Sequence, residues 1–234
     1  MKTSHLIMIS LLCLRPCQAA TTVSWGSSAL SNIVDSSGVL LDGASYTFEL
    51  GVFINPSDPS ALDPFTPDET NMEQWAENWA VFDLAAYEVI TEMFGTFGQF
   101  SGEAGILGDG RSNYEFADPS LSFVGRQAYI WVYNTDAPSS GTEWFLAKAP
   151  AWIFPEGSGD LSPGTPVDWR LPDLGTESPV WGSQLGNIGA GGYEVTSNSF
   201  ELQTFTATVV PEPSSAMLLG MGVCGLAFRR KRDS

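Results

Sequence analysis

The side chains that most often perform catalysis are confined to the two ends of this 234-residue chain. The single histidine is His5, and the three cysteines are Cys13, Cys17 and Cys224. Residues 20–209 therefore cannot supply a Ser-His-Asp triad, a thiol nucleophile or a zinc site with nitrogen and sulfur ligands. Acid–base chemistry in this region would depend on carboxylates, as it does in glycoside hydrolases.

Carboxylates are so abundant in residues 20–209 that no pair stands out by its spacing. The chain has 27 Asp and Glu residues, of which only Glu212 and Asp233 lie outside this region, so 25 remain. We therefore expect a protein that is not an enzyme and holds no cofactor. A glycoside hydrolase with paired carboxylates is the alternative.

The charge of this acidic region limits its partners. Only four of the ten Lys and Arg residues fall within it, which leaves a net charge of −21 against the 25 acids. Such a surface repels nucleic acid and anionic membranes, so we expect neither as a partner. The charge favours solubility, or divalent cations that bridge the protein to an acidic polysaccharide. The four cations are Arg111, Arg126, Lys148 and Arg170.

One aromatic stripe could bind a ligand. Tyr129, Trp131 and Tyr133 alternate along a predicted strand and would line one of its faces. Sugar rings stack on aromatic faces of this kind, so the stripe is a candidate platform for an exopolysaccharide. The opposite face, formed by Ile130 and Val132, is also apolar, and a strand at the centre of a core would have the same pattern. Both interpretations stay open at this point.

A calcium site is the one metal site that the sequence suggests. Residues 109–113 (Asp-Gly-Arg-Ser-Asn) carry oxygen ligands that Ca²⁺ could use, but their spacing is not that of an EF-hand loop. We expect a turn here rather than a metal site.

The C-terminal segment has three parts in a fixed order. Pro211, Glu212 and Pro213 break any preceding strand, an apolar run covers 216–228, and a basic cluster follows it. Residues 214–228 would form a helix of about 22 Å against a hydrocarbon core of about 30 Å, so this membrane helix would be a marginal anchor. The basic cluster would stay on the cytoplasmic side; it consists of Arg229, Arg230, Lys231 and Arg232.

Residues 210–234 resemble the PEP-CTERM sorting signals of exported bacterial proteins. The resemblance implies recognition of Pro211, Glu212 and Pro213 by an exosortase, a membrane enzyme that processes the chain nearby. It also implies a diderm bacterium, transient insertion into the inner membrane, and delivery to the cell surface or the extracellular matrix. It implies nothing about the domain before it, for which a carbohydrate-binding module is the alternative to a structural role.

The N-terminal segment has the pattern of a signal peptide. Lys2 precedes an apolar run at 6–14, and Cys17-Gln18-Ala19 fits the pattern of a cleavage site. We expect residues 1–19 to be removed by a cut after Ala19, or after Ala20.

The region between the two end segments reads mainly as β structure. Residues 46–54 alternate as a half-buried strand, and Asp42-Gly43 suggests a hairpin with 39–41. Residues 126–134 are apolar on both faces and predict a central strand. Shorter strands are expected at 144–147 and 152–154.

Three further segments complete the prediction. Residues 66–69 resemble a capping box, and Met72, Trp75, Ala76 and Trp79 then follow at helical spacing. The helix-or-strand character of 83–94 stays open, and long loops are expected across 155–192. A change of parity within 199–210 predicts a bulge near Gln203-Thr204. The fold class expected is a β-sandwich or jelly-roll-like domain with one short amphipathic helix.

Overall fold

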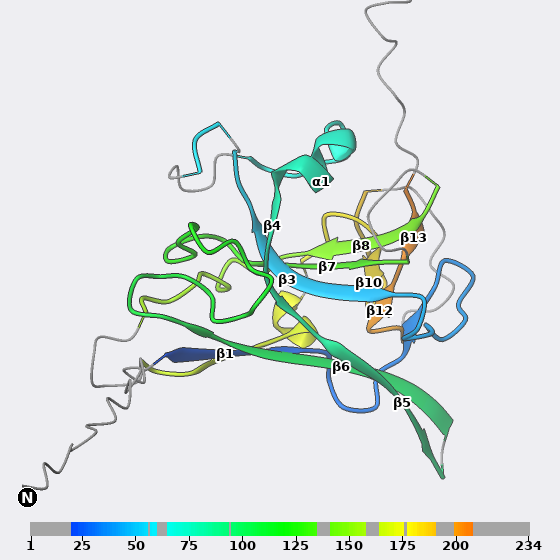
Figure 1. Ribbon diagram of the computed structural model, residues 1–234. Helices are drawn as coiled ribbons and strands as arrows, with labels where there is room; N and C mark the ends of the chain where they lie inside the picture. The colour runs from blue at the N-terminus through cyan, green and yellow to red at the C-terminus, as the bar shows by residue number, and fades with distance from the viewer. Residues whose placement is uncertain are drawn as a thin grey trace, which may run out of the picture.

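The chain folds mainly into β-sheets. The computed structural model describes residues 20–55, 57–59, 65–93, 95–134, 141–157, 164–175, 177–190 and 199–207. The central sheet has the strand order β13-β8-β7-β3-β4 and the outer sheet the order β5-β6-β1-β9. A small sheet has the order β11-β10-β12-β2. In the view of Figure 1, β3, β7 and β8 of the central sheet lie above β1 and β6 of the outer sheet.

Each sheet is built from strands that are distant in sequence. The central sheet contains β3 (Thr47–Phe53), β4 (Trp79–Leu84), β7 (Tyr129–Tyr133), β8 (Glu143–Ala147) and β13 (Phe205–Thr206). The outer sheet contains β1 (Thr21–Gly26), β5 (Ala86–Glu92), β6 (Gly95–Ile106) and β9 (Val167–Arg170). The small sheet contains β2 (Ile33–Val34), β10 (Ser183–Gln184), β11 (Asn187–Ile188) and β12 (Leu202–Gln203). The helical turns are η1 (Met72–Gln74), α1 (Trp75–Asn78) and η2 (Leu171–Leu174).

The main core lies between the central and outer sheets. Phe48 of β3 and Ile130 of β7 face it from the central sheet, and Trp25 of β1 and Phe100 of β6 face it from the outer sheet. The Phe48 and Phe100 rings stack with centroids 4.8 Å apart, so the two sheets are in direct contact here. This arrangement removes alternate side chains of every contributing strand from water.

The other face of the central sheet is also buried. Tyr129, Trp131 and Tyr133 of β7 lie in a second cluster, which Trp75 of α1 covers. The Trp75 and Trp131 rings meet edge to face with centroids 5.9 Å apart. Because both faces are covered, every residue of β7 is buried, and its sequence shows no polar alternation.

Several sequence predictions are confirmed by this architecture. The mainly β class is correct, and the strand within 126–134 is β7, at the centre of its sheet. The strand at 144–147 lies within β8. Residues 83–92 form strands rather than a helix: β4 ends at Leu84, and β5 begins at Ala86 in the outer sheet.

The predicted hairpin and helix are wrong in detail. Strand β3 pairs with β4 and β7 rather than with 39–41, where Leu40 bridges Val34 instead. The α-helix begins only at Trp75, because the Asn71 side chain bonds both the Asp68 N–H and the Thr66 carbonyl and so closes a turn where a capping box was expected.

Three further predicted segments differ from the structure in how their strands pair. Residues 152–154 form only an isolated bridge, between Gln127 and Ile153. The loop region 155–192 contains the short strands β9, β10 and β11. The parity change near Gln203-Thr204 is real, but its cause is a change of sheet: β12 belongs to the small sheet and β13 to the central one.

The turn between β10 and β11 offers a test of local strain. Leu185 and Gly186 both have positive φ, 47° and 84°, between the paired residues Gln184 and Asn187, as in a type I′ hairpin turn. A leucine side chain is strained in this conformation, whereas asparagine tolerates it. Leu185→Asn should therefore raise the free energy of unfolding by about 1 kcal/mol in a denaturant titration.

The matched control for this change is Ile188→Asn on the same hairpin. Ile188 is 44% exposed, much as Leu185 is at 46%, but it has no positive φ. The control should give no gain in stability. A Leu185→Asn protein no more stable than the wild type would show that the turn carries no strain.

Candidate functional site

The last described segment of the chain is buried almost to its end. Glu201, Leu202, Gln203, Thr204, Phe205 and Ala207 are all less than a tenth exposed. Strand β12 runs parallel to β2 and antiparallel to β10, and β13 pairs with β8. The Ala207 N–H donates to the Thr142 carbonyl at 2.7 Å, and the Gly141 N–H donates to the Ala207 carbonyl at 2.8 Å. The segment 201–207 thus contributes one strand to the small sheet and one to the central sheet.

Glu143 of β8 fixes this segment from one side. Its carboxylate accepts hydrogen bonds from the Thr204 hydroxyl at 2.5 Å, the Tyr46 hydroxyl at 2.9 Å and the Ser36 hydroxyl at 2.5 Å. Burial raises the pKa of Tyr46, and the Glu143 charge raises it further, so the phenol stays a donor. Glu143 therefore joins the C-terminal segment to two segments from early in the chain.

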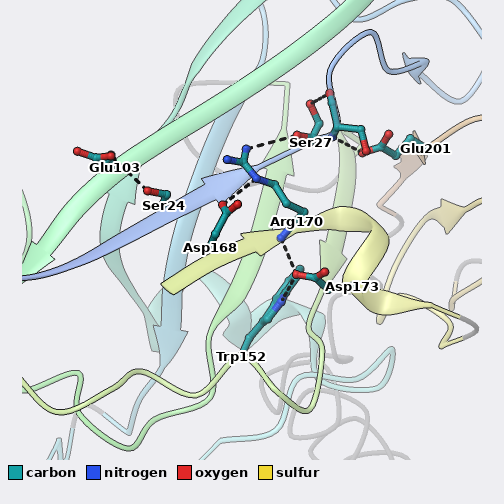
Figure 2. A network of polar contacts seen from close by, with 9 residues as sticks. Ser24, Ser27, Glu103, Trp152, Asp168, Arg170, Asp173 and Glu201 are labelled. Carbon is teal, nitrogen blue, oxygen red and sulfur yellow. Dashed lines mark hydrogen bonds and ion pairs between the residues drawn. The ribbon is translucent and has the colours of Figure 1, made fainter. Parts of the chain in front are cut away.

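Glu201 fixes the same segment from the other side. Its two carboxylate oxygens accept from the Ser28 N–H at 2.7 Å and the Ser31 hydroxyl at 2.6 Å. Figure 2 shows Glu201 beside the end of β1, close to Ser27. The Ser27 carbonyl in turn accepts from the Arg170 guanidinium at 3.5 Å. The beginning and the end of the domain are therefore held together by polar contacts as well as by strand pairing.

The same network orders the turn that follows β9. Arg170 forms an ion pair with Asp168 at 2.8 Å, while its backbone N–H donates to Asp173 at 2.7 Å. Asp173 also accepts from the Trp152 indole N–H at 3.3 Å (Figure 2). These contacts hold β9 in parallel register beside β1.

Most of the predicted processing residues fall outside the part of the chain that the structure describes. The basic cluster, Pro211, Glu212 and Pro213, and Ala19 are outside the described residues, whereas Ala20 is half-buried directly before β1. Strand β1 begins at Thr21, one or two residues after the two predicted signal cleavage sites. The described fold ends at Ala207, four residues before Pro211.

The predicted sugar platform is contradicted by its burial. Tyr129 and Tyr133 are each 4% exposed, and Trp131 is not exposed at all. Tyr129 meets Phe53 edge to face, and Trp131 meets Trp75 and Trp144 edge to face. Tyr133 in turn packs against Trp131. A sugar ring cannot stack on rings that are already covered. The sequence could not decide this point, because the cover comes from residues remote in the chain.

Two tryptophans share a structural pattern that the sequence did not reveal. Trp25 donates its indole N–H to Asp83 at 2.7 Å, and Trp79 donates to Glu49 at the same distance. Both carboxylates are buried, and burial raises the pKa of each above its usual range, although the indole bonds lower it. These two acids are therefore partners of the aromatic core.

Among the residues that the structure describes, no group of three or more His, Cys, Asp and Glu side chains is arranged to hold a metal ion. In the loop at 109–113, the Asp109 carboxylate accepts from the Arg111 guanidinium at 2.5 Å and from the Arg111 N–H at 3.2 Å. These bonds form a turn around Gly110, which has a φ of 84°. The calcium hypothesis stays untested.

Removing the Thr204 hydroxyl tests the closure by Glu143. Thr204→Val keeps the shape of the side chain but removes one donor from a carboxylate, which should lower the free energy of unfolding by about 1.5–3 kcal/mol. Thr91→Val on the exposed strand β5 is the control and should stay within about 0.5 kcal/mol of the wild type. Equal denaturation midpoints for both variants and the wild type would contradict the role of Glu143.

The raised pKa of Glu49 predicts a pH dependence with a definite sign. The folded protein disfavours ionised Glu49, so stability falls as pH rises from the unfolded pKa through the folded pKa. Glu49→Gln removes this penalty, and its stability relative to the wild type should increase between pH 4 and pH 7, measured by urea unfolding.

Asp68→Asn provides a control of opposite sign. Hydrogen bonds from Thr70 lower the pKa of Asp68, so the wild type gains stability as this group ionises. The relative stability of Asp68→Asn should therefore decrease as pH rises, and mostly below pH 4, because the lowered pKa of Asp68 lies under its ordinary value of 3.8. A decrease for Glu49→Gln as well would mean that the bonds from Trp79 and Tyr133 outweigh the burial of the Glu49 charge.

Comparison with known proteins identifies one motif, at the C-terminal end of the chain. No helix among the described residues has the length and apolarity needed to cross a membrane, and the run at 216–228 lies outside them. No curated protein and no solved structure matches the chain. A family model, the PEP-CTERM protein-sorting motif, matches residues 209–232, which confirms the resemblance seen in the sequence. The C-terminal segment is therefore a PEP-CTERM sorting motif, which begins two residues after the last described residue of the fold.

Proposed function

We propose that this protein is an exported, non-catalytic component of the cell surface or the extracellular matrix. In this proposal, residues 1–19 direct export and the C-terminal helix holds the chain briefly in the inner membrane. An exosortase-type enzyme then processes the segment around Pro211, Glu212 and Pro213. The domain at 20–209 is the part that is delivered.

The observation that carries the proposal is the position of the sorting motif relative to the fold. The match begins at residue 209, directly after a segment that is buried through Ala207. A cut near Pro211 would leave every contact of β12 and β13 in place. A cut upstream of 201 would remove both strands and expose the apolar core around Phe205.

The architecture is consistent with a stable domain that is exposed outside the cell. We assign the domain to the β-sandwich class, because two sheets share one core and the N-terminal and C-terminal segments are paired with each other. Its net charge of −21 favours solubility outside the cell, and the absence of cysteine from residues 20–209 makes its stability independent of disulfide formation.

Replacing the acidic residue of the motif tests the sorting proposal. Glu212→Ala should leave unprocessed precursor in the membrane fraction, detected by immunoblot against the domain, because recognition by the processing enzyme is lost. Asp233→Ala is the matched control: it removes an acid from the same tail but lies outside the matched residues, so processing should be normal. Normal processing of the Glu212→Ala protein would contradict recognition at this motif.

A further inference from the structure

One exposed aromatic side chain, beside a half-buried tyrosine, departs from the pattern of this fold. Seven of the eight tryptophans are buried, and so are most of the described phenylalanines. Phe116 is 74% exposed, and no other aromatic residue appears among the large exposed hydrophobic side chains of the described chain. Its ring meets that of Tyr114 edge to face, with centroids 5.5 Å apart. An aromatic surface is therefore presented to solvent at this one place.

The loop that carries this pair is held firmly. The Ser112 hydroxyl donates to the Phe82 carbonyl at 2.7 Å, and Asn113 exchanges two hydrogen bonds with Gly105 at 2.8 and 2.9 Å. The Arg111 guanidinium reaches the Pro119 carbonyl at 3.1 Å across the loop. The loop follows β6, and Figure 1 shows it in green at the margin of the molecule. The aromatic pair is thus presented in a fixed geometry, which lowers the entropy cost of binding.

The second half of the same loop forms one wall of a cavity of about 530 Å³. Ser120 and Ser122 line it together with Ser57 and Asp58 from the loop after β3, and the buried Arg126 closes it. The Arg126 guanidinium donates to the Ser122 and Pro59 carbonyls and holds the two loops together. The serine hydroxyls and the Asp58 carboxylate are groups of the kind that sugar hydroxyls bind. A volume of this size falls in the range of small-molecule sites, about 300–1,000 Å³.

The size of the apolar surface points to a sugar rather than to a protein. Stable protein interfaces bury about 800 Å² on each partner, far more than one pair of rings can supply. Around Phe116 the exposed residues Asn113, Glu115 and Asp118 are polar. The charge of −21 on residues 20–209 repels an anionic polysaccharide, which leaves a neutral one as the sugar ligand that we consider.

We propose that the loop at 111–122 is a binding site for a neutral polysaccharide. One sugar ring stacks on Phe116 beside Tyr114, and an adjacent ring of the same chain enters the cavity lined by Ser120 and Ser122. The site is separate from the buried stripe on β7. It extends the proposed function but stands independently of it, since binding by the mature protein does not depend on how its tail was processed.

Affinity electrophoresis of the mature exported protein tests this site. Native gels containing laminarin, dextran or galactomannan serve as neutral probes and alginate as the anionic one, with EDTA present to exclude cation bridging. We expect at least one neutral polysaccharide to retard the wild-type protein. Phe116→Ala should weaken that affinity about two- to twelve-fold, as expected for loss of one aromatic contact. Phe116→Tyr should retain it.

Met93→Ala is the matched control, because Met93 is also an exposed apolar residue, at 89%, but lies on the β5–β6 turn. It should bind as the wild type does. Circular dichroism establishes that each variant is folded. The proposal is overturned if none of the three neutral polysaccharides retards the wild type, if Phe116→Ala binds unchanged, or if alginate is preferred over all of them.

Discussion

Packing of the segment 201–207 is the constraint on which the rest of this structure depends. The segment supplies a strand to the small sheet and another to the central sheet, and it places Leu202 and Phe205 in two different cores. Burial of each such side chain contributes about 1.5–3 kcal/mol. Because β12 pairs with β2 from early in the chain, these contacts cannot form until residue 207 is available. The fold is therefore completed only by the residues that directly precede the sorting motif.

The acidic composition has two separate consequences. Most carboxylates lie at the surface and give the domain its charge, but Glu49 and Asp83 are buried as acceptors for indole N–H groups. Glu143 and Glu201 join the two ends of the domain through serine, threonine and tyrosine donors. Such directional bonds specify how segments distant in sequence meet, which apolar burial alone does not.

Sequence predictions succeeded where the interacting residues are close in sequence and failed where they are far apart. The central strand β7 could be predicted, because a residue run apolar on both faces requires cover on both sides. The PEP-CTERM motif could be found, because its parts are adjacent in sequence. By contrast, the sequence could not decide between core and sugar platform for the aromatic stripe on β7, since the rings of Trp75 and Trp144 that cover it approach from other parts of the chain. Trp79 fitted the helical stripe but begins β4, where Glu49 accepts its indole hydrogen bond.

The central claim is that processing spares the whole fold, from β1 to β13. The most direct test is the intact mass of the mature protein, with both termini confirmed by peptide mapping. We expect an N-terminus at Ala20 or Thr21 and a C-terminus after Ala207 but before the apolar run that begins at 216. A mature chain that ends before Ala207, or one that retains residues 216–228, would contradict the account.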